Sequence, residues 1–108
     1  MASGFLGKGI PAAATWQNIY TIPSGKLASF TINACNQSGT ALVDFVVSTS
    51  ASYLTLTQSE YLEYQANLPG QGSTLERTGI VSDATYGKYV WVRSTTGNVS
   101  FQVYGYEE

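Results

Sequence analysis

"IYTIPSGKLASFTINACN", from Ile19 to Asn36, is the stretch of sequence that decides the fold. Its second half alternates apolar and polar residues, and a period of two is typical of a strand with one buried face. Between the halves, Pro23 presets a backbone angle for a turn and Gly25 tolerates a positive φ. We therefore expect one strand, a tight turn and a second strand. The apolar residues of the second strand are Ala28, Phe30, Ile32 and Ala34.

A similar alternation recurs along the rest of the chain, interrupted by short turn segments. It indicates roughly seven to eight short strands at a spacing of about 8–12 residues, with no long window of helical period. This pattern predicts an all-β fold, an antiparallel β-sandwich of jelly-roll or Greek-key type, with an open barrel as the second choice. The expected strands lie at residues 16–22, 27–34, 41–47, 60–64, 75–81, 88–94 and 99–106, with a weaker one within 48–59.

Three local details follow from the pattern. In the strand at 41–47, Val43 and Phe45 face the core, so Asp44 points away from it. The strands at 88–94 and 99–106 are joined by "TTGN", and this spacing predicts a hairpin. Cys35 lies within a strand and is expected to be a small buried residue.

Residues 1–15 differ in composition from the rest of the chain. Glycines loosen the backbone there, while Phe5, Leu6 and Ile10 are apolar and costly to leave in water. We expect an N-terminal arm that docks on its own sheet or on a neighbouring molecule, with a frayed tail as the alternative. Residues 16–108 are expected to form a single β-sandwich domain, because a chain of 108 residues suits one domain.

Only 11% of the residues are charged, against about 25% in an average soluble protein. So little charge favours a surface that is partly covered by other protein. The five Lys and Arg residues are scattered and the net charge is −2, so we expect no nucleic-acid partner. The sequence has neither a long apolar stretch nor a secretory pattern. We therefore expect no membrane span and a location in the cytoplasm or in a particle assembled there.

The chain has no histidine and a single cysteine. Histidine is the commonest general base and metal ligand, and its absence excludes a Ser-His or Cys-His nucleophile. Carboxylate pairs remain, but with seven acids in one domain some pair always comes close, and we interpret them as solvated surface residues. We expect no enzyme activity, no cofactor and no metal, and an exposed Glu76–Arg77 ion pair. The acidic residues considered are Glu60, Glu63, Glu76 and Asp83.

Tyrosine is the residue type above background, with eight Tyr residues beside two Trp residues. Tyr and Trp supply large contact areas with a polar tip and are enriched at interfaces. The functional interpretation is a subunit interface, or a sugar-stacking surface on Tyr89, Trp91 and Arg93. The structural interpretation is that strands favour aromatic residues anyway. The candidate interface residues are Phe5, Leu6, Ile10, Trp16, Tyr61, Tyr64, Tyr89, Trp91 and Arg93.

One set of turn and strand residues extends over nearly the whole chain. In the first half it consists of Gly9, Pro11, Thr15, Tyr20 to Pro23, Gly25, Cys35 and Asn36, and in the second half of "EYLEYQANLPGQGSTLERTGIVS" and the closing "VYGYE". This set resembles a family of small structural proteins from tailed bacteriophages. In that family a strand ends in "LYTVP", a glycine turn follows, and the next strand ends in "CNR" or a variant, so Gln37 stands where the family often has arginine.

The resemblance implies a component of the virion, assembled in the cytoplasm of the host bacterium. We expect a capsid decoration (cement) protein that stabilises the head by bridging neighbouring subunits. Its partners would be further copies of itself, as a homotrimer or other homo-oligomer, and virion proteins such as the major capsid protein. The alternatives are a tail or baseplate subunit and a host-glycan-binding adsorption module. A glycoside hydrolase is the least favoured reading, because it needs two carboxylates in one cleft.

Overall fold

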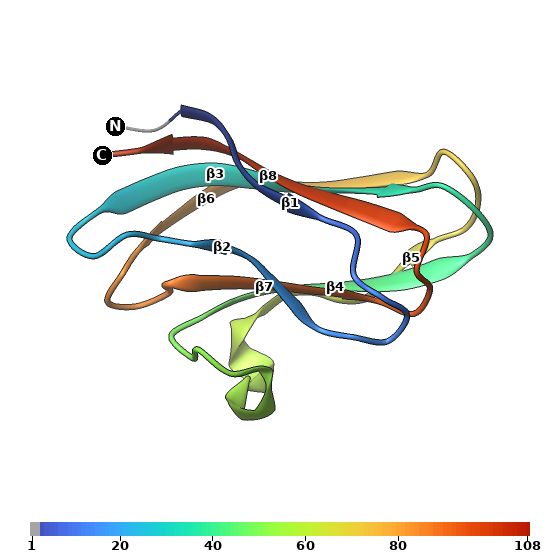
Figure 1. The fold of residues 1–108 in the computed structure, drawn as a ribbon, viewed down its shortest axis with the longest axis horizontal. Coiled ribbons are helices and arrows are strands. Elements are labelled where there is room, and N and C mark those ends of the chain that lie inside the picture. The colour runs from blue at the N-terminus through green and yellow to red at the C-terminus, as the bar shows by residue number, and fades with distance from the viewer. Residues whose placement is uncertain (1–2) are drawn as a thin grey trace.

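The computed structural model describes residues 3–108, which form two four-stranded sheets packed face to face (Figure 1). Neighbouring strands are antiparallel throughout. The prediction of an all-β antiparallel sandwich with seven to eight strands is confirmed. Residues 1 and 2 of the expected arm lie outside the described residues. The strands are β1 (Ser3–Gly9), β2 (Gln17–Thr21), β3 (Leu27–Asn36), β4 (Ala41–Ser48), β5 (Tyr61–Leu68), β6 (Thr74–Asp83), β7 (Tyr89–Ser94) and β8 (Val99–Glu107).

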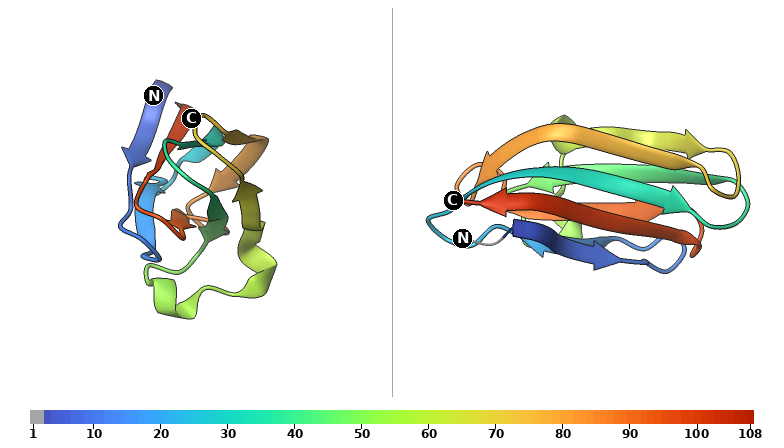
Figure 2. Two further views of the ribbon diagram at one scale, coloured as in Figure 1. Left: turned by 90° about the vertical axis from the view of Figure 1, so that its right-hand side faces the viewer. Right: turned by 90° about the horizontal axis from the view of Figure 1, so that it is seen from above.

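The strand order identifies the sandwich as a jelly roll. The first sheet has the order β1-β8-β3-β6 and the second sheet the order β2-β7-β4-β5. Each of the first four strands thus pairs with one of the last four: β1 with β8, β2 with β7, β3 with β6, and β4 with β5. The chain is a long hairpin rolled into a sandwich, which is the jelly-roll arrangement. Figure 2 shows the first sheet from above, with its strands side by side.

The hairpin expected from residues 88–94 and 99–106 is wrong. Both strands form, as β7 and β8, but they belong to different sheets, and so do β2 and β3 on either side of "PSGK". A turn sequence predicts that the chain reverses, whereas the partner of the next strand comes from a distant segment. Crossing to the opposite sheet lets the apolar faces of consecutive strands meet in one core.

The core fills the space between the two sheets. Phe45 of β4 and Phe101 of β8 are fully buried and meet edge to face, with ring centroids 6.0 Å apart. Burying one such side chain stabilises the fold by about 1.5–3 kcal/mol. Tyr20 also faces inward, where its ring packs on Phe30 and its hydroxyl donates to a Glu107 carboxylate oxygen at 2.5 Å. Burial, this hydrogen bond and the charge of Glu107 raise the pKa of Tyr20 far above its ordinary value.

The strand β3 follows the predicted alternation along its length. Its inward positions are buried, as expected from the sequence. Cys35 is half-buried on the outer side, so the prediction of a buried cysteine is wrong. The reason is the same alternation, which places Cys35 with the polar residues of the strand. These polar residues are Ser29, Thr31 and Asn33.

The N-terminal segment lies on its own sheet, which is one of its two expected positions. Strand β1 pairs with β8, with an irregularity between Phe5 and Gly7. Leu6, in this bulge, packs against the core. Gly7 approaches β2 so closely that a β-carbon there would lie 1.9 Å from the Ile19 carbonyl oxygen. Only glycine therefore lets β1 close the edge of the sandwich.

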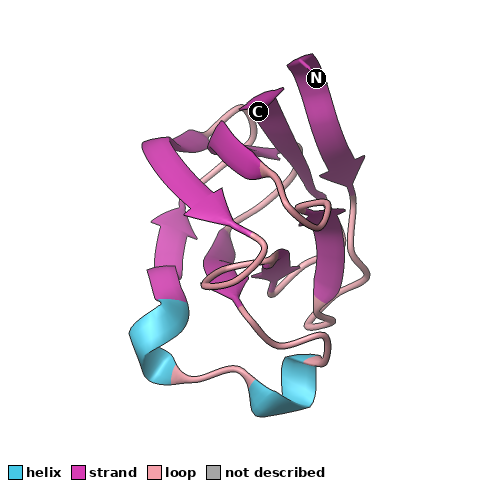
Figure 3. Cartoon of the chain, turned by 90° about the vertical axis from the view of Figure 1, so that its left-hand side faces the viewer, coloured by secondary structure: helices cyan, strands magenta, loops and turns pink. Residues whose placement is uncertain are grey.

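Residues 49–60 leave the sheets and lie below the second sheet in Figures 1 and 3. The weak strand expected within 48–59 is wrong, because two short 3₁₀ turns form there: η1 (Tyr53–Thr55) and η2 (Gln58–Glu60). Hydroxyl side chains in this segment bond to nearby backbone, which competes with pairing in a sheet. Among residues 3–108, no helix has the length and apolar character needed to cross a membrane.

Candidate interaction surface

Asp44 is the buried charge of the second sheet. It faces away from the core, as the alternation predicts, yet it is only 2% exposed. One carboxylate oxygen accepts a hydrogen bond from the Arg93 Nε at 3.0 Å, and the other accepts one from the Gln65 backbone amide at 2.8 Å. Arg93 lies on β7 and Gln65 on β5, the two strands that flank β4 in the sheet. The carboxylate therefore links three strands on the outer face.

Aromatic rings lie beside the ion pair of Asp44 and Arg93. The Arg93 guanidinium lies over the ring of Trp16 at 4.6 Å from the ring centroid. Trp16 meets Tyr61 edge to face at 6.0 Å, and Tyr61 meets Tyr64 in the same way at 5.3 Å. We call Trp16, Tyr61, Tyr64 and Arg93 the aromatic surface.

The packing of the aromatic surface fixes its geometry. A guanidinium held by a carboxylate and stacked on an indole has little freedom left. Burial and the negative charge of Asp44 raise the pKa of Tyr61, although Arg93 acts in the opposite direction. The phenol therefore stays protonated and offers a neutral polar tip. Tyr64 is 63% exposed at the edge of the group, where Gln58, Tyr61 and Tyr64 line a shallow depression of about 320 Å³.

The chemistry of this group suits binding. Its members provide aromatic contact area, donors at fixed positions and one cation that is already neutralised. Such a set favours recognition of a partner surface over proton transfer.

Trp91 and Tyr89 share the outer face of β7 with Arg93 but are not part of the aromatic surface. Trp91 is 8% exposed, with Tyr53 of η1 edge-on to its ring at 6.3 Å and its indole nitrogen donating to the Ser50 carbonyl at 3.1 Å. Tyr89 is half-buried, with the Lys88 ammonium 5.8 Å from its ring centroid. Trp91 is therefore covered by residues 49–60 and offers no open face for a sugar.

The remaining predicted interface residues belong to the N-terminal segment. Phe5 is 71% exposed and Ile10 is 56% exposed, whereas Leu6 packs against the core. Phe5 lies on the first sheet, beside Tyr104 of β8. Of the nine predicted residues, four meet in the aromatic surface, three belong to the N-terminal segment, and Tyr89 and Trp91 lie on β7.

Each of the acidic residues considered from sequence has a local partner. Glu63 pairs with Arg77 at 2.9 Å, so the expected Glu76–Arg77 pair is wrong. Glu76 instead accepts a hydrogen bond from the Tyr104 hydroxyl. Asp83 accepts backbone amide hydrogen bonds within its own turn. In the part of the chain that the structure describes, no three acidic or thiol groups lie close enough together to hold a metal ion.

Glu60 stabilises the connection between β4 and η2. It accepts hydrogen bonds from the Ser48 hydroxyl at 2.7 Å and from the Thr57 amide at 2.9 Å. Burial acts to raise the pKa of Glu60, but these hydrogen bonds outweigh it and lower the pKa below its ordinary value. The two hydrogen bonds give this carboxylate a structural role in the segment.

Sequence reasoning missed the participation of Asp44 in the surface. The available signal was the character of its neighbours on the same face, because Leu42 and Val46 are both apolar. An apolar outer face indicates that other residues shield it from water. A charged side chain that is shielded in this way needs an ion-pair or hydrogen-bond partner.

Comparison with protein-family models, with curated proteins and with solved structures found no match. The resemblance to phage structural proteins stays a prediction. Among residues 3–108, the exposed large apolar or aromatic side chains are those of Phe5, Ile10, Leu27, Tyr53, Leu54, Tyr64, Val81, Tyr86 and Tyr106.

Proposed function

We propose that this chain is a structural protein of a tailed-bacteriophage virion, a capsid decoration protein that bridges neighbouring capsid subunits. The observation that supports it most is the aromatic surface, held on the outside of a rigid sandwich. Aromatic residues and arginine contribute most of the binding energy at protein interfaces. Because Asp44 already fixes Arg93, a partner that covers the surface restricts few side chains further.

The sparse charge of the whole chain supports the same role. Only 11% of the residues are charged, while exposed apolar side chains such as Leu54, Tyr64 and Tyr86 are 63–83% accessible. So little charge favours a surface that is partly covered by other protein. The proposed partners are further copies of the chain, as a homotrimer or another homo-oligomer, and the major capsid protein.

The aromatic surface would serve a tail or baseplate subunit equally well, and this is the alternative position within the virion. A host-glycan module built on Tyr89, Trp91 and Arg93 receives less support, because Trp91 is covered. These alternatives differ in where the protein lies on the particle.

The test uses purified particles of the phage that encodes the chain. Immunogold labelling is expected to mark the heads, and quantitative mass spectrometry is expected to find many copies per particle. The variant Tyr64→Ala, which changes an exposed ring of the aromatic surface, is expected to reduce the copy number. Tyr86→Ala changes a ring that is 83% exposed and lies outside this surface, and it is expected to leave the copy number unchanged. Particles without the chain would refute the proposal.

A further inference from the structure

The outer face of the first sheet contains an ordered row of polar side chains. Lys8 of β1 lies opposite Gln102 of β8, Gln102 lies opposite Asn33 of β3, and Asn33 lies opposite Glu76 of β6. The row therefore crosses the whole sheet, with a cation at one end, a carboxylate at the other and two amides between them. Residues 49–60 lie on the opposite side of the sandwich and leave this face open (Figure 1).

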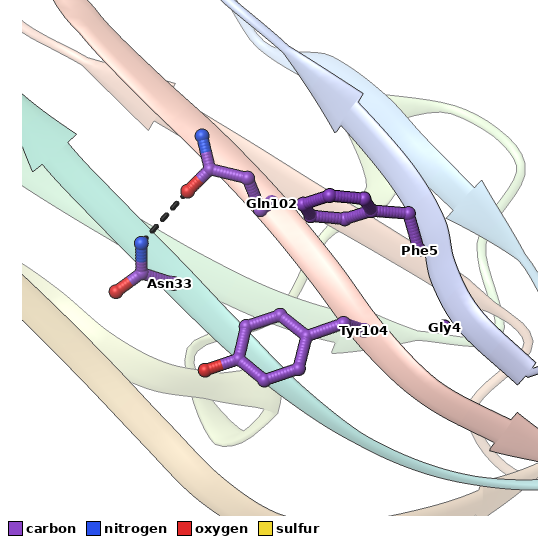
Figure 4. A pocket seen from close by; sticks show the side chains of 5 residues that line it. All are labelled: Gly4, Phe5, Asn33, Gln102 and Tyr104. Atoms are coloured by element: carbon purple, nitrogen blue, oxygen red, sulfur yellow. Dashed lines mark hydrogen bonds between the residues drawn. The ribbon is translucent and has the colours of Figure 1, made fainter.

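The two central amides are held in one orientation. The Asn33 Nδ2 donates to the Gln102 Oε1 at 2.7 Å, as Figure 4 shows. This bond leaves the Gln102 Nε2 as a donor and the Asn33 Oδ1 as an acceptor, and neither has a hydrogen-bond partner among residues 3–108. Both side chains are half-buried, so a ligand would meet a donor and an acceptor at fixed positions.

Two aromatic rings stand beside the amides. The Tyr104 hydroxyl donates to the Glu76 carboxylate, which lies beyond β3, so the ring extends across that strand (Figure 4). This hydrogen bond raises the pKa of Tyr104 and keeps the hydroxyl protonated. Phe5 is 71% exposed and stands at 87° to the Tyr104 ring, with centroids 6.4 Å apart. Together with Gly4, these side chains line a hollow of about 510 Å³.

The chemistry of this hollow selects among ligands. A purely apolar ligand would leave the free amide donor and acceptor unpaired, which is unfavourable. An anion such as phosphate would find no charged group among the residues that line the hollow, and the row on either side of it ends in one cation, Lys8, and one carboxylate, Glu76, of opposite charge. A sugar ring has an apolar C–H face for stacking and hydroxyl groups that both donate and accept.

We propose that the outer face of the first sheet binds a saccharide, whose ring stacks on Tyr104 against Phe5 while its hydroxyl groups bond to Asn33 and Gln102. This site is distinct from the aromatic surface and from the sugar platform expected on β7. It does not depend on the position of the protein in a virion. Because the hollow is open, we expect a single sugar to bind weakly, with a Kd on the order of 1 mM.

The test is a titration of the full chain, labelled with ¹⁵N, with the methyl glycosides of glucose, galactose and mannose and with methyl N-acetylglucosaminide. At least one glycoside is expected to shift the side-chain NH₂ signals of Asn33 and Gln102. Tyr104→Ala is expected to weaken binding at least tenfold, and Tyr104→Phe less, because the ring remains. The matched control is Tyr106→Ala, which changes a ring on the same strand that is 45% exposed; it is expected to bind like the wild type.

The overturning results are equally specific. The proposal fails if none of the four glycosides shifts these signals, or if Tyr104→Ala binds as well as the wild type while retaining dispersed amide signals. It also fails if the shifted signals belong to Tyr61 and Tyr64, because the sugar would then bind the aromatic surface. Virion labelling is measured separately, so its outcome and this one are distinguishable.

Discussion

Replacing Asp44 by alanine removes the carboxylate that supports the aromatic surface. The substitution deletes the hydrogen bonds from the Arg93 Nε and the Gln65 amide. Breaking a buried ion pair by removing one partner costs about 3–5 kcal/mol. The Arg93 side chain is 31% exposed and stays partly solvated over Trp16, which reduces this cost. We therefore expect a loss of about 2–4 kcal/mol in the free energy of unfolding, out of about 5–15 kcal/mol for a typical domain.

The conservative variant separates charge from shape. Asp44→Asn keeps an oxygen that can accept from the Gln65 amide but removes the negative charge, so we expect a loss of about 1–2 kcal/mol. Glu108→Ala removes an exposed carboxylate and serves as the control, with a change within about 0.5 kcal/mol.

The assay is urea unfolding followed by tryptophan fluorescence, to which Trp16 contributes beside Arg93. With a slope of about 2 kcal/mol per molar urea, the middle of the usual range, the Asp44→Ala midpoint is expected to fall by about 1–2 M. The reasoning is refuted if Asp44→Ala unfolds at the same urea concentration as the wild type. It is also refuted if Asp44→Asn and Asp44→Ala are equally stable, because the hydrogen bond from the Gln65 amide, which asparagine can keep, would then contribute nothing.

Three further predictions test the fold and its response to pH. Gly105→Ala would place a β-carbon 2.0 Å from a backbone oxygen of β3, so we expect the free energy of unfolding, measured in urea, to fall by about 2–3 kcal/mol. The control is Gly70→Ala, whose β-carbon would enter open space and which is expected to change the free energy of unfolding by less than about 0.5 kcal/mol. The raised pKa of Tyr20 beside Glu107 stabilises the fold fully below pH about 10, and this stability is lost as the pH rises above that value. Above pH about 10, the melting temperature of Tyr20→Phe is therefore expected to fall less steeply with pH than that of the wild type. The lowered pKa of Glu60 stabilises the fold above pH about 4.3, and this stability is lost as the pH falls through the pKa of the folded state. We therefore expect Glu60→Gln to be less stable than the wild type at neutral pH and to differ little from it in strong acid. An equal difference in stability at both pH values would contradict this.

The positions of the strands could be predicted from sequence because strand periodicity is a local property. The alternation in β3, for example, places Phe30 and Ile32 inside, and both are buried. The sheet to which each strand belongs could not be predicted. "TTGN" marks a reversal of the chain, but β8 pairs with β1 and β3, which lie far away in sequence. Long-range pairing depends on how all the apolar faces meet, and no local window contains that information.

In the candidate site, too, the individual residues could be predicted from sequence but their spatial arrangement could not. Trp16, Tyr61, Tyr64 and Arg93 could each be chosen from sequence as candidate interface residues. Their meeting depends on the register between β4 and β7, which puts Arg93 opposite Asp44, and on irregular pairing between β4 and β5. Such irregularities change which face a side chain points to, and they leave no clear trace in the sequence. The sequence could not show that Trp91 is covered. Residues 49–60, which cover it, have a pattern that predicts a weak strand and not a cover.

Cryo-electron microscopy of the purified phage particle tests the proposed role most directly. The proposal predicts density for the jelly-roll sandwich on the outside of the head, in many symmetry-related copies, with Trp16, Tyr61 and Arg93 buried against a neighbouring subunit. A particle whose head and tail contain no such sandwich would contradict the proposed role. A sandwich that contacts its neighbours only through other faces, with the aromatic surface open to solvent, would contradict the interface assigned to it.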